Sequence, residues 1–127
     1  MSIDRGATVF VVDDDEMVRD SLRALLEAHR FQVLDFESAG RFLDSRDGIP
    51  KGCLLVDMHM PEMNGLQLLQ ALRMAGDGMP VIIFTGRNDP AIEAQAMALG
   101  ATAVLDKPVT YKTLLAAIRR ALGSGAT

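Results

Sequence analysis

The hexapeptide Cys53-Leu54-Leu55-Val56-Asp57-Met58 decides how this chain folds. Apolar residues run without a break into a single acid, which is the pattern of a strand buried on both faces of a parallel sheet. A carboxylate at the end of such a strand is costly unless cations or hydrogen bonds compensate its charge. Asp57 is therefore the candidate centre of a functional site, and the rest of the chain must supply its partners.

Segments typical of strands and of helices alternate along the rest of the chain. Short runs rich in apolar and β-branched residues predict strands at 8–12, 31–36, 53–57, 80–84 and 102–105. Apolar periodicity and end signals predict helices at 16–30, 38–46, 66–75, 90–100 and 110–122. The last of these helices is expected to place on one side Tyr111, Leu114, Leu115, Ile118 and Leu122.

The alternation predicts an α/β domain with a doubly wound, five-stranded parallel sheet. Parallel neighbours need crossover connections, and crossovers are right-handed, so the helices are expected to cover both faces of the sheet. In such a sheet, polar groups at the carboxyl ends of the strands meet in one crevice, where the strand order reverses.

Size and charge limit the class of protein. The 127 residues fit one domain, 1–127, with flexible ends at 1–6 and 123–127. The net charge is -4 and acids and bases are interspersed, so we expect no direct binding to nucleic acid. Because no apolar run approaches the roughly 20 residues that span a bilayer, and because the amino end does not resemble a signal peptide, we expect a cytoplasmic protein without membrane contact.

Polar side chains at four strand ends are predicted to meet at one edge of the sheet. Asp13 and Asp14 follow the first strand, Asp57 ends the third, Thr85 ends the fourth and Lys107 follows the fifth. Three carboxylates repel one another and a single lysine cannot balance them, whereas a divalent metal ion can. Ligands that are all oxygen atoms favour Mg²⁺ over zinc, for which histidine or cysteine ligands would be expected.

With the metal bound, this cleft can receive a dianionic phosphoryl group. Asp57 can then act as a carboxylate nucleophile and form an acyl phosphate. Thr85 and Lys107 would hold the phosphoryl oxygens, and the metal would neutralise the charge that develops in the transition state.

Each of these residues also has an ordinary structural interpretation. The three acids Asp13 to Asp15 could cap the helix that follows, and we expect Asp15 to do only that. Lys107 could belong to an ordinary turn and Thr85 could cap a loop, and it is their combination with Asp57 that favours a function. The side chain of His59 is expected to affect water access rather than to transfer protons.

Several stretches form a recognisable pattern: Val11-Val12-Asp13-Asp14, Asp57 with Met60-Pro61-Glu62-Met63-Asn64-Gly65, Thr85-Gly86 and Lys107-Pro108. In this order and spacing they resemble the receiver domain of bacterial two-component response regulators, over nearly the whole chain. The acids followed by Val18-Arg19 and Ser21-Leu22, taken with Thr85-Gly86, are similar to the FixJ-like branch of that family.

The resemblance implies a flavodoxin-like sheet with strand order 2-1-3-4-5. It implies that Asp57 is the phosphoacceptor and that Asp13 and Asp14 are metal-binding acids. It also implies that the main-chain carbonyl of His59 is a further metal ligand, beside Asp57 itself.

The resemblance further implies that Thr85 is the switch hydroxyl and that Lys107 is the phosphoryl partner, often with a cis bond to Pro108. The chain departs from the family pattern three residues before this lysine, where Val104 replaces the usual Tyr or Phe. We therefore expect activation to move Thr85 and the loop 86–89, with a smaller change in the output surface formed by the fourth predicted helix, the fifth strand and the fifth helix.

The resulting hypothesis is a phosphoacceptor in a two-component or phosphorelay signalling system. A sensor histidine kinase or a phosphotransfer protein would donate the phosphoryl group to Asp57, with Mg²⁺ as cofactor. The phosphorylated chain would switch an output surface and could regulate transcription through a separate or removed output domain. It would not be an enzyme, apart from its self-directed phosphoryl transfer and dephosphorylation. A phosphorylation-dependent dimer is left open, as is the choice between a stand-alone receiver and a fragment.

Two other classes of function remain as alternatives. A haloacid-dehalogenase-type phosphatase would use acids two positions apart, as Asp13 and Asp15 are, but Met17 stands where it would have Thr or Val. No later acidic pair supplies its metal site. A binding module that no longer takes phosphate is the other alternative, and the complete set of site residues argues against it.

Overall fold

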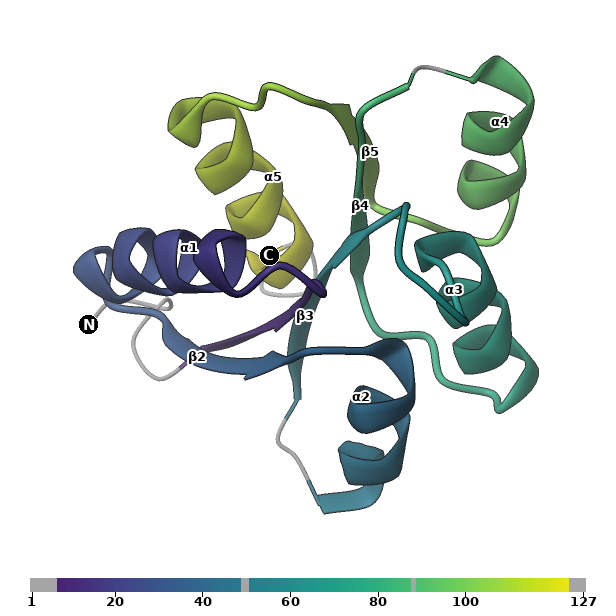
Figure 1. Cartoon of the computed structure of the whole chain (residues 1–127), viewed down its shortest axis with the longest axis horizontal. Helices are drawn as coiled ribbons and strands as arrows, with labels where there is room; N and C mark the ends of the chain where they lie inside the picture. Colours follow the sequence, from purple (N-terminus) through teal and green to yellow (C-terminus); the bar gives the residue numbers. More distant parts are fainter. Residues whose placement is uncertain (1–6, 49–50, 88, 124–127) are drawn as a thin grey trace.

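The structure is a computed structural model that describes residues 7–48, 51–87 and 89–123. Within these residues, five parallel strands pair in the order β2-β1-β3-β4-β5 (Figure 1). The strands are β1 (Thr8–Val12), β2 (Gln32–Phe36), β3 (Gly52–Asp57), β4 (Val81–Thr85) and β5 (Ala103–Asp106). The helices are α1 (Glu16–Ala28), α2 (Ala39–Ser45), α3 (Gly65–Met74), α4 (Pro90–Ala98) and α5 (Tyr111–Gly123), and a 3-10 turn, η1 (Arg46–Gly48), follows α2. The predicted fold class and strand order are confirmed.

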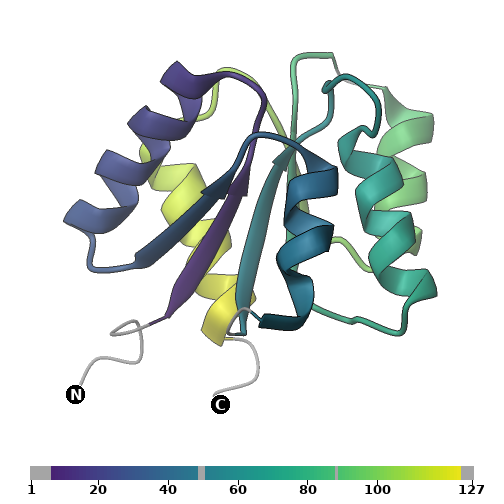
Figure 2. The same ribbon diagram turned by 60° about the horizontal axis from the view of Figure 1, so that its bottom comes forward.

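Helices cover both faces of the sheet, with α1 and α5 on one face and α2, α3 and α4 on the other (Figures 1 and 2). Alternate residues of each central strand face opposite layers, because side chains alternate along a strand. In β3, Cys53 and Leu55 pack in the layer beneath α1 and α5, whereas Leu54 and Val56 pack in the other layer. This is why the central strands are apolar without a break, as the hexapeptide predicted.

Capping residues set the starts of the helices. The side chain of Asp89 accepts hydrogen bonds from the amides of Ala91 and Ile92, and Pro90 is the first residue of α4. Asn64 and Gln67 form a reciprocal capping box at the start of α3.

Most element bounds differ from the sequence prediction by one or two residues, and one side chain is placed differently. The first helix ends at Ala28 rather than at residue 30, because Arg30 adopts a left-handed conformation with φ of 71°. Tyr111 does not share the buried side of α5. It is 53% exposed, and the small residues Ala117 and Ala121 are buried instead.

Some predictions fall outside the described residues. The expected flexible ends at 1–6 and 123–127 lie there, except for Gly123, which is the last residue of α5. Within the described part of the chain, no helix combines the length and the apolar character that crossing a membrane requires.

Candidate functional site

Asp57 lies at the carboxyl end of β3, at the centre of the sheet. It is the last residue of the strand, is only 7% exposed, and pairs in register with Phe84 of β4. On the other side of β3 lies β1. The chain continues from β1 to β2 at one edge of the sheet, whereas it continues from β3 to β4 and toward the other edge. Asp57 therefore sits at the point where the strand order reverses, which is where ligands bind in open α/β sheets.

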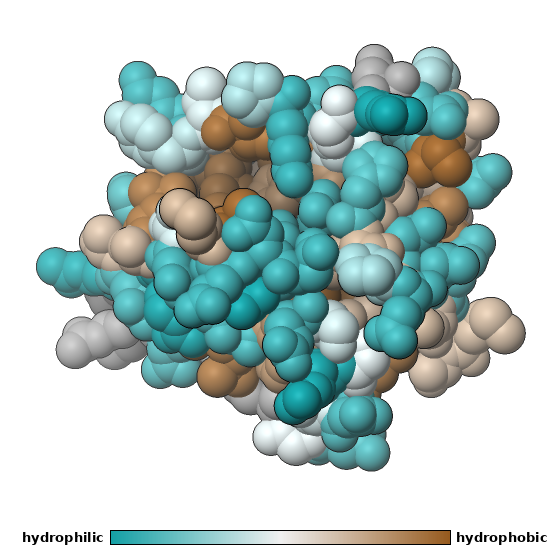
Figure 3. All heavy atoms as spheres, in the orientation of Figure 1, coloured by the Kyte–Doolittle hydropathy of each residue, from teal (hydrophilic) through white to brown (hydrophobic). Residues whose placement is uncertain are grey.

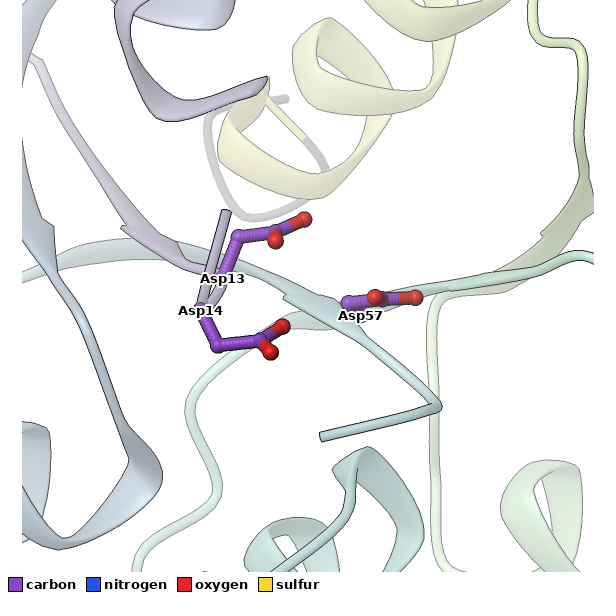
Figure 4. Close-up of side chains that lie close together, drawn as sticks. All are labelled: Asp13, Asp14 and Asp57. Carbon is purple, nitrogen blue, oxygen red and sulfur yellow. The ribbon is translucent and has the colours of Figure 1, made fainter. Parts of the chain in front are cut away.

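Asp13 and Asp14 converge on Asp57 from the end of β1 (Figure 4). One carboxylate oxygen from each of the three residues lies within 4.8 Å of the other two. Asp13 is buried and Asp14 is exposed, so the cluster is closed on one side and reachable from solvent on the other. The structure thus brings together the three acids that the sequence predicted as metal ligands.

Lys107 supplies positive charge beside these acids. Its Nζ lies 3.3 Å from Oδ1 of Asp57, and its amide donates a 2.8 Å hydrogen bond to the carbonyl oxygen of Thr85 at the end of β4. The bond between Lys107 and Pro108 is cis, as the resemblance implied. Lys107 is 43% exposed, so its ammonium group can approach the cleft from the solvent side.

The Oδ1 atom of Asp57 is buried and accepts no hydrogen bond from the described residues. Nζ of Lys107 forms an ion pair with this oxygen atom, but the two groups are not oriented for a hydrogen bond. A buried carboxylate oxygen without a donor is costly, and it is an available ligand or nucleophile.

Electrostatics in the cluster also favour a cation. Burial raises the pKa of Asp13 above its usual value, and the carboxylates of Asp57 and Asp14 raise it further. A hydrogen bond from the Asp15 amide and the charge of Lys107 act in the opposite direction without cancelling the rise. A divalent cation would relieve the repulsion, and these oxygen donors fit a hard ion such as Mg²⁺.

The loop after β3 packs closely against Asp57. The amide of Gly65, the first residue of α3, donates a 3.1 Å hydrogen bond to the carbonyl oxygen of Met58. A Cβ atom at Gly65 would lie 2.9 Å from the carbonyl oxygen of Asp57, so only glycine fits here without a shift. The side chain of His59 is exposed, and the role of its carbonyl as a metal ligand stays a prediction.

Thr85 ends β4 and is buried, but its hydroxyl is already engaged. It donates a 2.7 Å hydrogen bond to the carbonyl oxygen of Arg87 and accepts one of 3.1 Å from the Arg87 amide. The role of Thr85 toward a phosphoryl group therefore stays a prediction. To bind a phosphoryl oxygen, the Thr85 hydroxyl must break its hydrogen bond to the Arg87 carbonyl.

One residue near the site was not predicted from the sequence. Nη1 of Arg19, on α1, donates a 2.6 Å hydrogen bond to the carbonyl oxygen of Asp13. The helical pattern only places Arg19 off the apolar face of α1. A basic residue one turn into the helix that follows two acids is the signal that could have pointed to this contact.

Asp15 takes no part in the acidic cluster. Its carboxylate accepts a hydrogen bond from the amide of Met17 and caps α1, as expected. The spacing of Asp13 and Asp15 that a haloacid-dehalogenase-type phosphatase would use is thus explained by a helix cap.

An apolar groove opens beside the site, between α1 and the start of α5. Figure 3 shows it as a hydrophobic recess between these two helices. Its volume is about 550 Å³, and its lining residues include Val18, Leu22, Phe84, Lys107 and Leu114. Lys107 belongs both to this groove and to the pair with Asp57, so the groove adjoins the acidic cleft.

Comparison with curated proteins shows extensive similarity to transcriptional regulators. The transcriptional regulatory protein FixJ of Azorhizobium caulinodans is 42% identical over 118 residues, which cover 93% of this chain and 56% of that protein. The transcriptional regulatory protein TdiR of Thauera aromatica is 43% identical over 117 residues, which cover 92% of this chain and 52% of that protein. The chain spans about half the length of these curated relatives.

Solved structures and a family match agree with this similarity. The structure of FixJ-N superposes with a TM-score of 0.86 at 36% identity and covers 93% of this chain and 94% of its own. The response regulator StyR superposes with a TM-score of 0.88 at 41% identity and covers 95% of this chain and 61% of its own. The family described as "Response regulator receiver domain" matches residues 9–119. The chain belongs to the family of response regulator receiver domains.

Proposed function

We propose that Asp57 accepts a phosphoryl group from a phosphohistidine of a sensor histidine kinase or phosphotransfer protein. The observation that carries the proposal is the buried Oδ1 of Asp57, which accepts no hydrogen bond from the described residues and lies 3.3 Å from Nζ of Lys107, on a carboxylate that clusters with Asp13 and Asp14. A carboxylate held in this way is a nucleophile with a cation on one side and a metal-binding cluster on the other.

In the proposed reaction, one carboxylate oxygen of Asp57 attacks phosphorus. The new O–P bond forms while the P–N bond to the donor imidazole breaks, and the imidazole leaves with the bonding electrons and takes up a proton. Lys107 approaches the transferred group and balances the charge on its oxygens. Mg²⁺, held by Asp13, Asp14, Asp57 and the main-chain carbonyl of His59, would neutralise the charge of the phosphoryl oxygens.

Water then hydrolyses the acyl phosphate and returns Asp57 to its free form. The chain acts only on its own phosphoryl group in both steps, and this separates the proposal from an enzyme that turns over a free substrate. The match to receiver domains and the capping role of Asp15 disfavour the phosphatase alternative. The assembled site disfavours a binding module that ignores phosphate.

The groove between α1 and α5 supports contact with a donor protein. It exposes apolar side chains beside Lys107, and a donor that presents a phosphohistidine to Asp57 must approach this edge of the sheet. We place this exchange in the cytoplasm, where a two-component kinase would meet its receiver.

The proposed output is transcriptional control through a domain outside this chain. The curated relatives FixJ and TdiR are transcriptional regulatory proteins about twice as long as the matched region. Phosphorylation would shift the population of a two-state domain, because the phosphoryl group contacts Thr85 and Lys107 in one state better than in the other.

The test is an intact mass spectrum after treatment with acetyl phosphate and Mg²⁺. We expect the mass of one phosphoryl group to be added per chain, and a chelator to prevent it. Asp57→Asn should abolish the added mass, whereas Asp20→Asn, which changes an exposed acid on α1, should leave it intact. Failure of the wild-type chain to gain mass would contradict the proposal, and catalytic turnover of a simple phosphate ester would favour the phosphatase.

A further inference from the structure

We propose that Arg19 is a positioning residue for the metal site. Its guanidinium group holds the peptide group that joins Asp13 to Asp14, and so determines how the two carboxylates meet. The inference rests on the proposed function only in taking these acids as metal ligands.

Two consecutive acids can bind one ion only if the backbone between them turns. In a strand, neighbouring side chains point to opposite faces of the sheet. Asp13 and Asp14 instead both point toward Asp57 (Figure 4), and the chain bends at Asp14. The orientation of the peptide group between the two acids therefore decides whether both carboxylates reach the same point.

Arg19 binds that same peptide group. Its Nη1 lies 2.6 Å from the carbonyl oxygen of Asp13, which is the oxygen of the peptide joining Asp13 to Asp14. A hydrogen bond from a charged donor is stronger than one between neutral groups, so it fixes the peptide plane firmly. Arg19 is partly buried on α1, and its own amide donates a 3.0 Å hydrogen bond to the carbonyl oxygen of Asp15.

Other contacts hold the amide and the carboxylate of Asp13. The amide of Asp13 donates a 3.2 Å hydrogen bond to the carbonyl oxygen of Phe36 in β2. The carboxylate of Asp13 accepts a 2.9 Å hydrogen bond from the amide of Asp15. The contact from Arg19 completes this set at the carbonyl group. Groups that orient metal ligands from outside the coordination shell usually matter for metal affinity.

If Arg19 acted only through its positive charge, removing it would change the Mg²⁺ affinity in the opposite direction. A guanidinium group close to the site repels a divalent cation, so removing it would tighten Mg²⁺ binding if Arg19 acted only through its charge. If Arg19 positions the ligands, removing it weakens binding. The sign of the change in dissociation constant therefore separates the two roles.

The experiment titrates Mg²⁺ into the whole chain and follows binding by calorimetry and by amide chemical shifts of Asp14 and Met58. We expect Arg19→Gln to raise the dissociation constant about tenfold, the lower end of the effect typical of residues that orient metal ligands. Arg19→Lys should recover part of the loss, because it keeps a charged donor on a long side chain.

The matched control is Arg23→Gln, which removes the same charge from the same helix. Arg23 pairs with Glu27 and Asp35 rather than with the bend at Asp14. Its replacement should leave the dissociation constant unchanged or slightly lower. Circular dichroism and thermal unfolding establish that each variant is folded.

The outcomes separate this inference from the proposed function. A folded Arg19→Gln variant whose dissociation constant is unchanged or lower would overturn the role of Arg19. If the wild-type chain binds Mg²⁺ but Asp57 gains no phosphoryl group, the proposed function fails and the titrations still decide the role of Arg19. A wild-type chain with no saturable Mg²⁺ binding would overturn both.

Discussion

The hydroxyl of Thr85 and the backbone of Arg87 form a pair of hydrogen bonds that closes the turn after β4. The hydroxyl donates to the Arg87 carbonyl oxygen at 2.7 Å and accepts from the Arg87 amide at 3.1 Å. A threonine hydroxyl has a single proton to donate. It cannot serve Arg87 and a phosphoryl oxygen at once, so engaging the phosphoryl group must release the Arg87 carbonyl.

We predict that a beryllofluoride mimic of the phosphoryl group, added with Mg²⁺, shifts the amide signals of Thr85 and Arg87. In Thr85→Val the Arg87 shift should be lost, because that side chain can neither donate to the mimic nor release Arg87. Thr85→Ser keeps a hydroxyl and should retain the shift. The measurement is a comparison of amide spectra with and without the mimic.

The same spectra test how far the change travels. Val104, which replaces the usual aromatic residue, packs against the core beneath α4 and is partly buried. Since no aromatic ring is available there to move with Thr85, we expect shifts in the cleft and the loop at 86–89, with small shifts along α5. Large shifts throughout Tyr111–Gly123 would contradict this expectation.

Lys107 should matter for transfer and not for metal binding. We predict that Lys107→Gln slows labelling of Asp57 by acetyl phosphate about 100-fold, the scale of removing one group that stabilises transition-state charge. Mg²⁺ affinity should not weaken, because a positive charge is removed from beside the acids. Rates of labelling at saturating Mg²⁺ and a separate Mg²⁺ titration measure the two effects.

The control for this variant is Lys112→Gln, an exposed lysine in the first turn of α5. It should label at the wild-type rate. A Lys107→Gln variant that is slow only because it no longer binds Mg²⁺ would show that Lys107 has a different role.

Much of the site could be predicted because it depends on topology. Asp57 follows an unbroken apolar run, and parallel strands place all their carboxyl ends at one edge. The convergence of Asp13, Asp14 and Lys107 on Asp57 therefore follows from the order of strands and helices alone.

The contacts that the sequence did not predict depend on rotamers and loop backbone. The bond from Arg19 to the Asp13 carbonyl requires a bend at Asp14, and the engagement of Thr85 with Arg87 requires a particular turn after β4. Neither geometry has a periodic signal. Tyr111 was misplaced for a related reason: at the first position of α5 the helical pattern matches, but the side chain is 53% exposed and lines the open groove beside α1.

The raised pKa of Asp13 predicts how stability depends on pH without a metal. At pH values between the usual aspartate pKa of about 4 and the higher pKa of Asp13 in the folded chain, Asp13 keeps its proton in the folded chain but has lost it in the unfolded chain. The free energy of unfolding therefore falls as the pH rises through this interval. Above the pKa of Asp13 in the folded chain, the destabilisation by this carboxylate has reached its full size.

Asp13→Asn should remove this cost, because the amide oxygen can still accept from the Asp15 amide without carrying charge. In a chelator at neutral pH we predict a variant about 1 kcal/mol more stable than the wild-type chain. Saturating Mg²⁺ should reverse the order, because only the wild-type chain keeps the full ligand set. Urea unfolding at several pH values measures both. A variant that is less stable than wild type in chelator would contradict the argument.

Arg73 joins the carboxyl ends of α3 and α4, and its loss should lower stability without touching the site. Its guanidinium group donates to the carbonyl oxygens of Leu99 at 2.6 Å, Asp77 at 2.7 Å and Gly100 at 3.3 Å. These oxygens lie where the helices end and have no helical partner. We predict that Arg73→Ala lowers the free energy of unfolding by about 2 kcal/mol, since it leaves partly buried carbonyl groups unpaired.

Arg73→Lys should be intermediate, because an ammonium group cannot reach all three oxygens in the fixed geometry of a guanidinium. Arg41→Ala is the control, because the ion pair of Arg41 with Glu37 is exposed on both sides and should contribute less than about 0.5 kcal/mol to the free energy of unfolding.

Urea unfolding followed by far-ultraviolet circular dichroism suits a chain that has no tryptophan. Labelling of Asp57 should stay at the wild-type rate in all three variants at a temperature where each is folded. Equal losses of stability in Arg73→Ala and Arg41→Ala would show that the three carbonyl contacts contribute no more than an exposed ion pair.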